Sequence, residues 1–417
     1  MSDTRRAVGA VLVADLVSTF GSEMTGVALP WFVLITTGSP ARMAGVMAAE
    51  FVGIAALGVV GGRLTHGLGA RRTMMLGDAV RAPLLMLVPV LNWAHALHYV
   101  VLLVVGLVVG SWFPSYTSAQ RLLLAASAGD DDVRLTRVGG AFGAVNETAS
   151  FLGPAAGGIL VAAVGAPWAL VADALTYAVA FVVIAVAVPP DYGRADAPPV
   201  AVGAGLRFLR GDVAIRRQLA AVMVSSIAWT ALMATLPVLA RHRYHGGAAL
   251  AGTFVAAYGA GSVAGGIASS RTRVVGRRRL GTAFVAFAVV AWLMVPRLPA
   301  WCIVLAVAAI GVCNGIYFPR LFTALTLRPP PELRHSVMTA AQSVMSSTSP
   351  IGFVAAGVLL DRASIMSAFL LVAGAATVSA VVSVTGQSLR TGVDVEGGAA
   401  QEAHEGEPGL LGQVDRE

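Results

Sequence analysis

Apolar stretches of about twenty residues recur along the chain and are separated by short polar loops that carry arginine. A helix of ~20 residues spans the ~30 Å hydrocarbon core of a bilayer, so each stretch predicts a transmembrane helix. Breaks at turn-forming residues divide the pattern into twelve spans. The predicted spans are 8–36, 43–62, 73–92, 98–120, 138–163, 167–188, 218–240, 249–269, 280–296, 300–325, 335–360 and 364–386.

The longest polar interval between spans, Pro189 to Arg217, follows the sixth span. The sequence therefore predicts an all-α membrane protein with six-helix bundles at residues 1–188 and 218–386. Residues 189–217 are predicted to form a cytoplasmic linker, in which Leu206 to Leu219 mixes apolar side chains with arginines. This mixture is typical of a helix lying in the membrane interface, and a plain linker is the alternative. Residues 387–417 are acidic and rich in glycine, which predicts a disordered tail.

Composition and charge agree with a membrane protein. The chain is 57% hydrophobic and 12% charged, with a mean hydropathy of +0.77, too little charge to cover a water-soluble surface. All 29 basic residues are arginines, and with an internal N-terminus 23 of them lie in cytoplasmic segments and five outside. The positive-inside rule thus predicts cytoplasmic termini in a multi-pass protein of the cell membrane. The same bias accounts for the net charge of +7, so no nucleic-acid partner is expected.

The sequence carries no motif of an enzyme or a cofactor site. GxxxxGK[ST], HExxH and GxSxG are missing, and the two cysteines, Cys302 and Cys313, lie within one apolar span. Neither a metal nor a cofactor is expected. Without an ATP-binding segment, transport would draw its energy from an ion or substrate gradient.

Weak self-similarity relates the two halves. GVVGGRLTHGLGARR (58–72) matches GGIASSRTRVVGRRR (265–279) at an offset of 207, and SWFPS (111–115) matches IYFPR (316–320) at an offset of 205. Parallel repeats of this kind are related by an axis along the membrane normal and hold a substrate site at their interface.

Several segments in their order and spacing resemble the major facilitator superfamily, and in detail its branch of macrolide-efflux and enterobactin-exporter proteins. The resemblance implies the major facilitator fold and transport of a small molecule. It rests on VALPWFVL (27–34) followed by Thr37, Gly38 and Ser39, GGRLTHGLGARR (61–72), DAVRAP (78–83), FPSYTSAQ (113–120), GPAAGGIL (153–160) and DALTYAVAF (173–181).

The resemblance also implies that the loop after the second span clamps the halves shut on the cytoplasmic side through ionic contacts. The aspartate and arginine usual there are replaced by His66 and Gly67, and the mid-helix arginine of many proton-coupled drug antiporters is missing, because Arg121 lies at a helix end. GPAAGG resembles the glycine-proline motif of antiporters, which permits close helix approach and a kink. The predicted gating-loop and hinge residues are Gly62, His66, Gly69, Arg71, Arg72, Gly153, Pro154, Gly157 and Gly158.

Charged side chains inside the spans are few, and each costs ~2.5–3.5 kcal/mol at the bilayer centre, so each implies a partner, a water-filled cavity or a function. Asp15, Ser18, Thr19, Ser22 and Glu23 share one stripe of the first span. A buried carboxyl group favours its protonated form, so Glu23, Asp15 and Glu147 are predicted proton-coupling residues. The alternative is that these carboxylates are hydrogen-bonded packing residues.

Asp78 and Arg81 stand three residues apart and predict an internal ion pair. Glu50 and Asp173 lie nearer the outer ends of their helices, where water at the membrane rim is expected to hydrate their carboxylates. Hydroxyl, amide and aromatic side chains predict a substrate cavity with one acidic wall and one aromatic, hydroxylic wall, and packing of these aromatics within the bundle is the alternative. The candidates are Ser18, Ser22, Trp112, Tyr116, Trp229, Tyr258, Asn314, Tyr317, Gln342 and Ser346.

These features together predict a monomeric secondary active transporter that exports amphipathic small molecules of drug, antibiotic or siderophore type in exchange for protons. Two alternatives stay open. One is uptake or facilitated diffusion of a polar solute. The other is a membrane sensor or scaffold that kept the bundle and lost transport.

Overall fold

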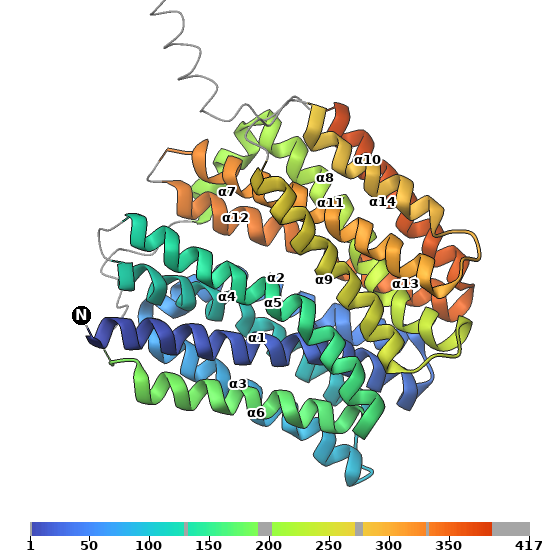
Figure 1. The fold of residues 1–417 in the computed structure, drawn as a ribbon, viewed down its shortest axis with the longest axis horizontal. Helices are drawn as coiled ribbons and strands as arrows, with labels where there is room; N and C mark the ends of the chain where they lie inside the picture. The colour runs from blue at the N-terminus through green and yellow to red at the C-terminus, as the bar shows by residue number, and fades with distance from the viewer. Residues whose placement is uncertain (1, 129–131, 191–201, 272–277, 331–332, 386–417) are drawn as a thin grey trace, which may run out of the picture.

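The computed structural model describes residues 2–128, 132–190, 202–271, 278–330 and 333–385, and every regular element within these ranges is a helix (Figure 1). Within the described residues, ten helical segments are long and apolar enough to cross a membrane, and one of them, Ser336–Arg362, is formed by α12 and α13 together. The prediction of an all-α membrane protein is confirmed.

The first six helices pack on one another and are called the N-bundle. In it α2 lies against α4, α1 against α5 and α6, and α3 against α6. The helices are α1 (Ser2–Thr37), α2 (Pro40–Leu68), α3 (Ala70–Trp93), α4 (Tyr99–Ala128), α5 (Asp132–Val164) and α6 (Ala166–Ala187).

The helices after the linker form a second group, called the C-bundle, in which α9 lies against α11, α8 against α13 and α14, and α10 against α14. Its members are α8 (Val213–Val238) with the π-helical turn η1 (Leu239–Arg243), α9 (Ala248–Arg271), α10 (Arg278–Leu293), α11 (Ala300–Leu327), α12 (Arg334–Ser346), α13 (Ser349–Arg362) and α14 (Ile365–Thr385). Eleven of the twelve predicted spans coincide with single helices of the two bundles, α8 being continued by η1.

One predicted span differs from the structure. The sequence predicted a single helix over 335–360, but the chain breaks at Ser347 and Thr348, between α12 and α13. Pro350 stands in the first turn of α13, where its missing N–H costs no helical hydrogen bond, whereas inside a continuous helix it would remove one. The Thr348 hydroxyl donates to the Met223 carbonyl of α8 at 2.8 Å, which holds the break in place.

A short amphipathic helix, α7 (Val202–Gly211), lies in the predicted linker and packs against α12. The Gly205 N–H donates to the Ser336 hydroxyl at 2.7 Å. The predicted interfacial helix, 206–219, is thus two elements. Asp212 separates them, because its carboxylate accepts the Ala214 and Ile215 N–H groups and begins α8.

Both bundles contain a helix pair that packs through glycines. A Cβ added at Gly110 of α4 would collide with the Glu50 carbonyl of α2, and one at Gly311 of α11 would collide with the Tyr258 carbonyl of α9. Gly106 and Gly110 stand 205 residues before Gly311 and Gly315, the offset already found for Pro114 and Pro319. Small residues let membrane helices approach backbone to backbone, so the α2/α4 and α9/α11 pairs repeat one packing solution.

Gly311→Ala is expected to destabilise the protein by about 1–3 kcal/mol, because its Cβ meets backbone, which cannot turn away as a flexible side chain can. The apparent melting temperature of purified protein measures the effect. Gly374→Ala on α14 is the matched control, since a Cβ there has no neighbour within 4 Å. Equal melting temperatures for the two variants would contradict the packing argument.

The two bundles meet at one end of the molecule. The far side is the end at which α1 stops at Thr37, and the N-terminal side is the end at which it begins. At the far side the Ser39 hydroxyl donates to the Asp361 carboxylate at 3.0 Å, and Arg241 donates to the Leu34 carbonyl at 3.2 Å. A Cβ on Gly158 of α5 would lie 2.8 Å from the Ala248 carbonyl of α9.

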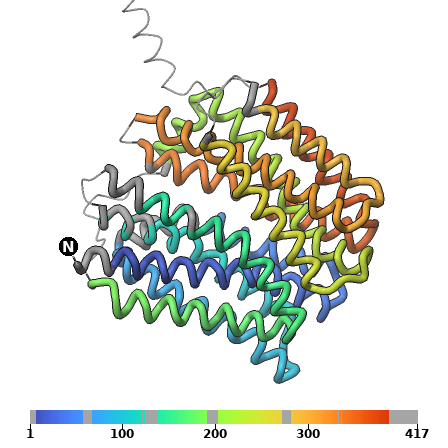
Figure 2. The backbone as a smooth tube through the Cα atoms, viewed as in Figure 1, coloured from blue at the N-terminus to red at the C-terminus, as the bar shows by residue number. Residues whose placement is uncertain are grey.

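Towards the N-terminal side the contact between α5 and α9 opens. A Cβ on Gly143 of α5 or on Gly266 of α9 would have no neighbour within 4 Å. Figure 2 shows the same arrangement, with the bundles against each other on the right and separating towards the left, where the N-terminus lies. The structure is therefore closed at the far side.

Candidate functional site

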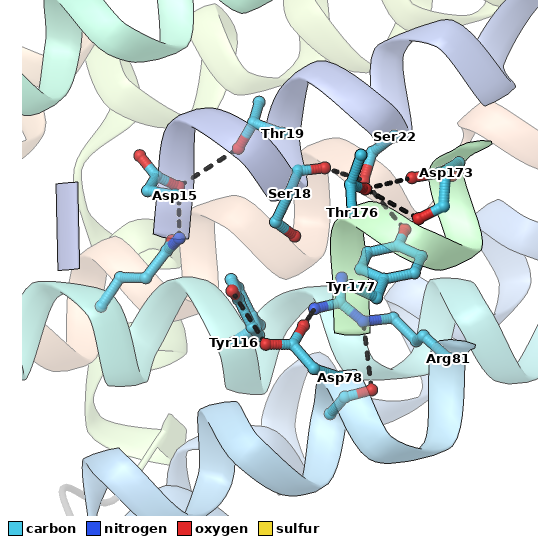
Figure 3. A network of polar contacts seen from close by, with 12 residues as sticks. Asp15, Ser18, Thr19, Ser22, Asp78, Arg81, Tyr116, Asp173, Thr176 and Tyr177 are labelled. Carbon is cyan, nitrogen blue, oxygen red and sulfur yellow. Dashed lines mark hydrogen bonds and ion pairs between the residues drawn. The ribbon is translucent and has the colours of Figure 1, made fainter. Parts of the chain in front are cut away.

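A buried ion pair lies at the centre of the N-bundle (Figure 3). Arg81 donates to Asp78 at 2.7 Å, and the two residues are 5% and 0% exposed. The guanidinium lies between the rings of Tyr116 and Tyr177, 4.2 and 4.3 Å from their centroids. Cation–π contacts of this kind are worth up to ~2 kcal/mol when desolvated, so the pair and both rings form one stabilising unit from α3, α4 and α6.

Asp15 of α1 forms a second polar centre. Its carboxylate accepts hydrogen bonds from Thr19 and Asn146, each at 3.1 Å, and from Gln120. Sequence reasoning missed Gln120 and Asn146 because they come from α4 and α5, whose faces meet α1 only in the fold. Three neutral donors satisfy a buried carboxylate without a cation.

Glu23 lies where α1 packs against α5. The Ser150 hydroxyl donates to its carboxylate at 3.0 Å, and Gly153 leaves room for its Cβ. Glu147 precedes Ser150 by one turn of α5. The structure thus brings Glu23 and Glu147, two of the three predicted coupling residues, to one place, and Asp15 lies two turns before Glu23 on α1.

Asp173 of α6 corrects the sequence analysis. The expectation was hydration from the membrane rim, but Asp173 is 0% exposed. Thr176 donates to one carboxylate oxygen at 3.0 Å, and the other oxygen has no hydrogen-bond partner among the described residues. The prediction failed because nearness to a helix end says nothing about which face of the helix is covered.

A cavity of about 580 Å³ lies mainly within the C-bundle. Glu147 of α5 and Phe51 of α2 are its only lining residues from the N-bundle in the described part of the chain. Six of the predicted cavity residues line it: Trp229, Tyr258, Asn314, Tyr317, Gln342 and Ser346.

The other four predicted cavity residues lie elsewhere. Ser22 hydrogen-bonds to Tyr177, Tyr116 covers Arg81, Ser18 is buried in the N-bundle, and Trp112 packs beside Gly77. The sequence analysis missed several lining residues, because phenylalanines, cysteines and serines in apolar spans carry no signal that separates packing from lining. They include Phe51, Ser225, Ser226, Ser262, Phe284, Phe287, Cys313, Phe318 and Phe322.

The cavity has an aromatic wall and a single carboxylate. The Trp229 ring centroid is 6.2 Å from Phe51 and 6.1 Å from Tyr258, and Asn314 donates to the Tyr258 hydroxyl. Glu147 is the one charged side chain that lines the cavity in the described ranges. Aromatic faces beside a carboxylate attract organic cations. Within the same ranges no cluster of His, Cys, Asp and Glu is arranged to hold a metal ion.

Comparison with known proteins decides the family. The sequence profile described as Major Facilitator Superfamily matches residues 11–353. The chain belongs to the major facilitator superfamily. It is therefore a membrane-embedded transporter of a small molecule and not an enzyme, as the resemblance implied.

Similar proteins of the superfamily include the multidrug efflux pump Tap of Mycobacterium tuberculosis (strain ATCC 25618 / H37Rv). It is 25% identical over 396 residues, which cover 91% of this chain and 93% of Tap. Tap of Mycolicibacterium fortuitum is 25% identical over 383 residues, covering 89% and 93%. A crystal structure of a mutant of the nucleoside transporter NupG matches with a TM-score of 0.67 at 13% identity, covering 90% of this chain and 98% of NupG, and shows the superfamily fold.

The loop associated with gating in the superfamily is partly described. Gly69 has a φ of 80°, a left-handed conformation that favours glycine, and precedes α3. Arg71 donates to the Ala185 and Val188 carbonyls at 2.8 and 2.7 Å, tying the start of α3 to the end of α6, and Arg72 is exposed. The backbone at Gly62 and His66 belongs to α2, and their side-chain surroundings lie outside the described part.

The GPAAGG segment lies where α5 contacts both neighbours. Gly153 and Gly157 face α1 at Glu23 and Met24, and Gly158 faces α9 at Ala248. The Pro154 carbonyl lies against Gly252 of α9. The segment predicted as a hinge therefore sits at the junction of the two bundles.

Proposed function

We propose that this chain exports amphipathic organic cations by alternating access and exchanges them for protons. One observation carries the proposal: Glu147 of the N-bundle faces the aromatic wall of a C-bundle cavity of about 580 Å³, so both halves contribute to one site. This volume falls within the ~300–1,000 Å³ of small-molecule sites. The similar proteins named multidrug efflux pumps support export of drug-like molecules.

Alternating access is supported by the contacts between the bundles. They close the far side and separate towards the N-terminal side. In this proposal the N-terminal side faces the cytoplasm, as the positive-inside rule predicts, so a substrate would enter the cavity from the cell interior. Export then requires the far-side contacts to break and the N-terminal side to close.

Proton exchange is assigned to Glu23 and Glu147. Glu147 would hold either a proton or the cationic group of the substrate, and Glu23, hydrogen-bonded to Ser150 one turn from Glu147 on α5, would respond to the charge at Glu147. Asp15 is the third candidate, with its carboxylate already held by three donors. In this proposal the chain acts as a monomer in the cell membrane with cytoplasmic termini, and the bundles at 1–188 and 218–386 are its moving parts.

Transport by purified protein in liposomes tests the proposal. A fluorescent amphipathic cation should move in exchange for protons, and collapsing the proton gradient should stop its uphill movement. Transport that continues unchanged without the gradient would remove proton coupling. Counterflow of a sugar or an organic acid, without movement of cations, would overturn export and favour the carrier for polar solutes.

A further inference from the structure

Arginines gather on the N-terminal side of the C-bundle, where α7 ends and α8 begins. Four of them are exposed: Arg207, Arg210, Arg216 and Arg217. None of the four forms an ion pair with a carboxylate in the part of the chain that the structure describes. Asp212, the carboxylate between them in the sequence, is already engaged, because it caps α8 and pairs with Arg328 at 2.8 Å. This surface therefore carries four positive charges without a matching anion.

Contacts with two helix ends hold a pair of these guanidinium groups in place. Arg216 donates to the Arg210 carbonyl in the last turn of α7 at 3.1 Å, and Arg217 donates to the Thr385 carbonyl at the end of α14 at 3.1 Å. A guanidinium group has five N–H donors. The other donors of both side chains have no partner among the described residues, so they are free to bind a further acceptor.

α7 holds its own arginines on its outer face. Gly205 and Leu209 are buried, and a Cβ on Gly205 would lie 2.2 Å from the Ser336 carbonyl of α12. Arg207 and Arg210 stand one turn apart on the exposed face. Because α7 touches α12 backbone to backbone, these two cations stay at the surface beside Arg216.

The end of α14 shows the depth of this surface in the membrane. Val378, Val381 and Val384 are exposed in its last two turns. Exposed apolar side chains of a transmembrane helix face the acyl chains of lipids. Thr385 follows these valines directly, so its carbonyl and the Arg217 guanidinium lie at the level where acyl chains end and headgroups begin.

The ligand chemistry follows from the donors. Guanidinium groups bind phosphate oxygens through paired hydrogen bonds. The ammonium group of a zwitterionic headgroup would find no free carboxylate here among the described residues, since Asp212 is paired. We propose that Arg210, Arg216 and Arg217 form a site for an anionic phospholipid, whose phosphate lies between the ends of α7 and α14. The inference goes beyond the proposed function and does not depend on it.

Binding of dioleoylphosphatidylglycerol to Arg216→Gln/Arg217→Gln tests the site. The purified full chain in a neutral detergent is titrated with the lipid, and native mass spectrometry measures the bound fraction. The variant is expected to bind about ten- to thirtyfold more weakly than the wild type, because each basic residue near anionic lipid contributes a factor of about five. Dioleoylphosphatidylcholine should bind more weakly than the anionic lipid to the wild type, and equally to the wild type and the variant.

Arg297→Gln/Arg362→Gln is the matched control, because it removes two exposed arginines from the far side. It should bind the anionic lipid as the wild type does. The lipid should also raise the apparent melting temperature of the wild type and of the control, since a ligand of the folded state stabilises that state, and leave that of Arg216→Gln/Arg217→Gln unchanged. If the double variant yields no folded protein, Arg217→Gln alone tests the same site, with an expected loss of about fivefold.

Three outcomes would overturn the site. Equal losses in the variant and in the control would show attraction by net charge alone. Binding of glycerol phosphate as tightly as the lipid would make the ligand a soluble phosphate. The acidic residues 387–417 follow α14 in the sequence, and lipid binding that appears only after their deletion would make that segment the occupant. Selective loss of anionic lipid in Arg216→Gln/Arg217→Gln supports the site, whatever the protein transports.

Discussion

Glu147→Gln is expected to abolish export of amphipathic cations and to weaken their binding at least about tenfold. Glu147 is the one charged side chain on the described cavity wall, and glutamine keeps its size and removes its charge. Two unit charges 4 Å apart interact by ~4 kcal/mol at an effective dielectric constant of 20, and desolvation offsets part of this energy. Equilibrium binding to purified protein measures the loss.

The control for this prediction is an uncharged amphiphile, whose binding should survive the substitution. Glu50→Gln supplies a matched variant, because Glu50 does not line the cavity. Unchanged affinity of Glu147→Gln for the cation would contradict the assignment of Glu147 as the substrate's counter-ion.

Arg81→Met is expected to destabilise the protein by about 3–5 kcal/mol, the cost of leaving one member of a buried ion pair without its partner. Asp78 would remain 0% exposed and lose its nearest cation, and Tyr116 and Tyr177 would lose the guanidinium between them. A lower apparent melting temperature and a lower yield of monodisperse protein would report the change.

Arg42→Met serves as the control, because Arg42 is exposed and its guanidinium lies 5.7 Å from the Tyr99 ring, a weaker arrangement. Replacing both partners, as Asp78→Leu with Arg81→Met, should recover part of the loss, since apolar residues of similar volume leave no buried charge. Arg81→Met that is as stable as Arg42→Met would refute the role of the ion pair.

The helices and their repeat could be predicted from the sequence because both depend on local patterns. The length of the apolar stretches predicted the spans. Pro114 and Pro319 are 205 residues apart, and the glycines that pack α4 against α2 and α11 against α9 repeat at the same offset. The break before Pro350 was equally visible in the sequence, but the apolar pattern continues through it and outweighed the proline. Pro350 favours the start of a new helix, and the hydrogen bond from Thr348 to the Met223 carbonyl, which only the fold reveals, holds the break in place.

The sequence predicted six of the lining residues, but it could not show that the C-bundle supplies nearly all of the lining, because equivalent positions of the two halves have different surroundings. Trp112 and Tyr317 are separated by 205 residues and occupy matching places in α4 and α11. Tyr317 lines the cavity, whereas Trp112 packs beside Gly77 in the half whose interior is filled by the Asp78–Arg81 pair. The sequence pattern of one helix predicts on which face of the helix a side chain lies. Whether that face lines a cavity or is covered depends on the helix packed against it, which the pattern does not show.

The glycine contacts of α2 with α4 and of α9 with α11 have a mechanical consequence. α2 and α9 also carry the junction with the opposite bundle, through α13 and α5. Because the backbones of α2 and α4, and of α9 and α11, are in direct contact, α2 and α9 cannot bend without colliding with their partners. In the proposed alternating-access cycle, this packing favours a rigid-body rotation of whole halves, with the displacement at the α2/α13 and α5/α9 contacts.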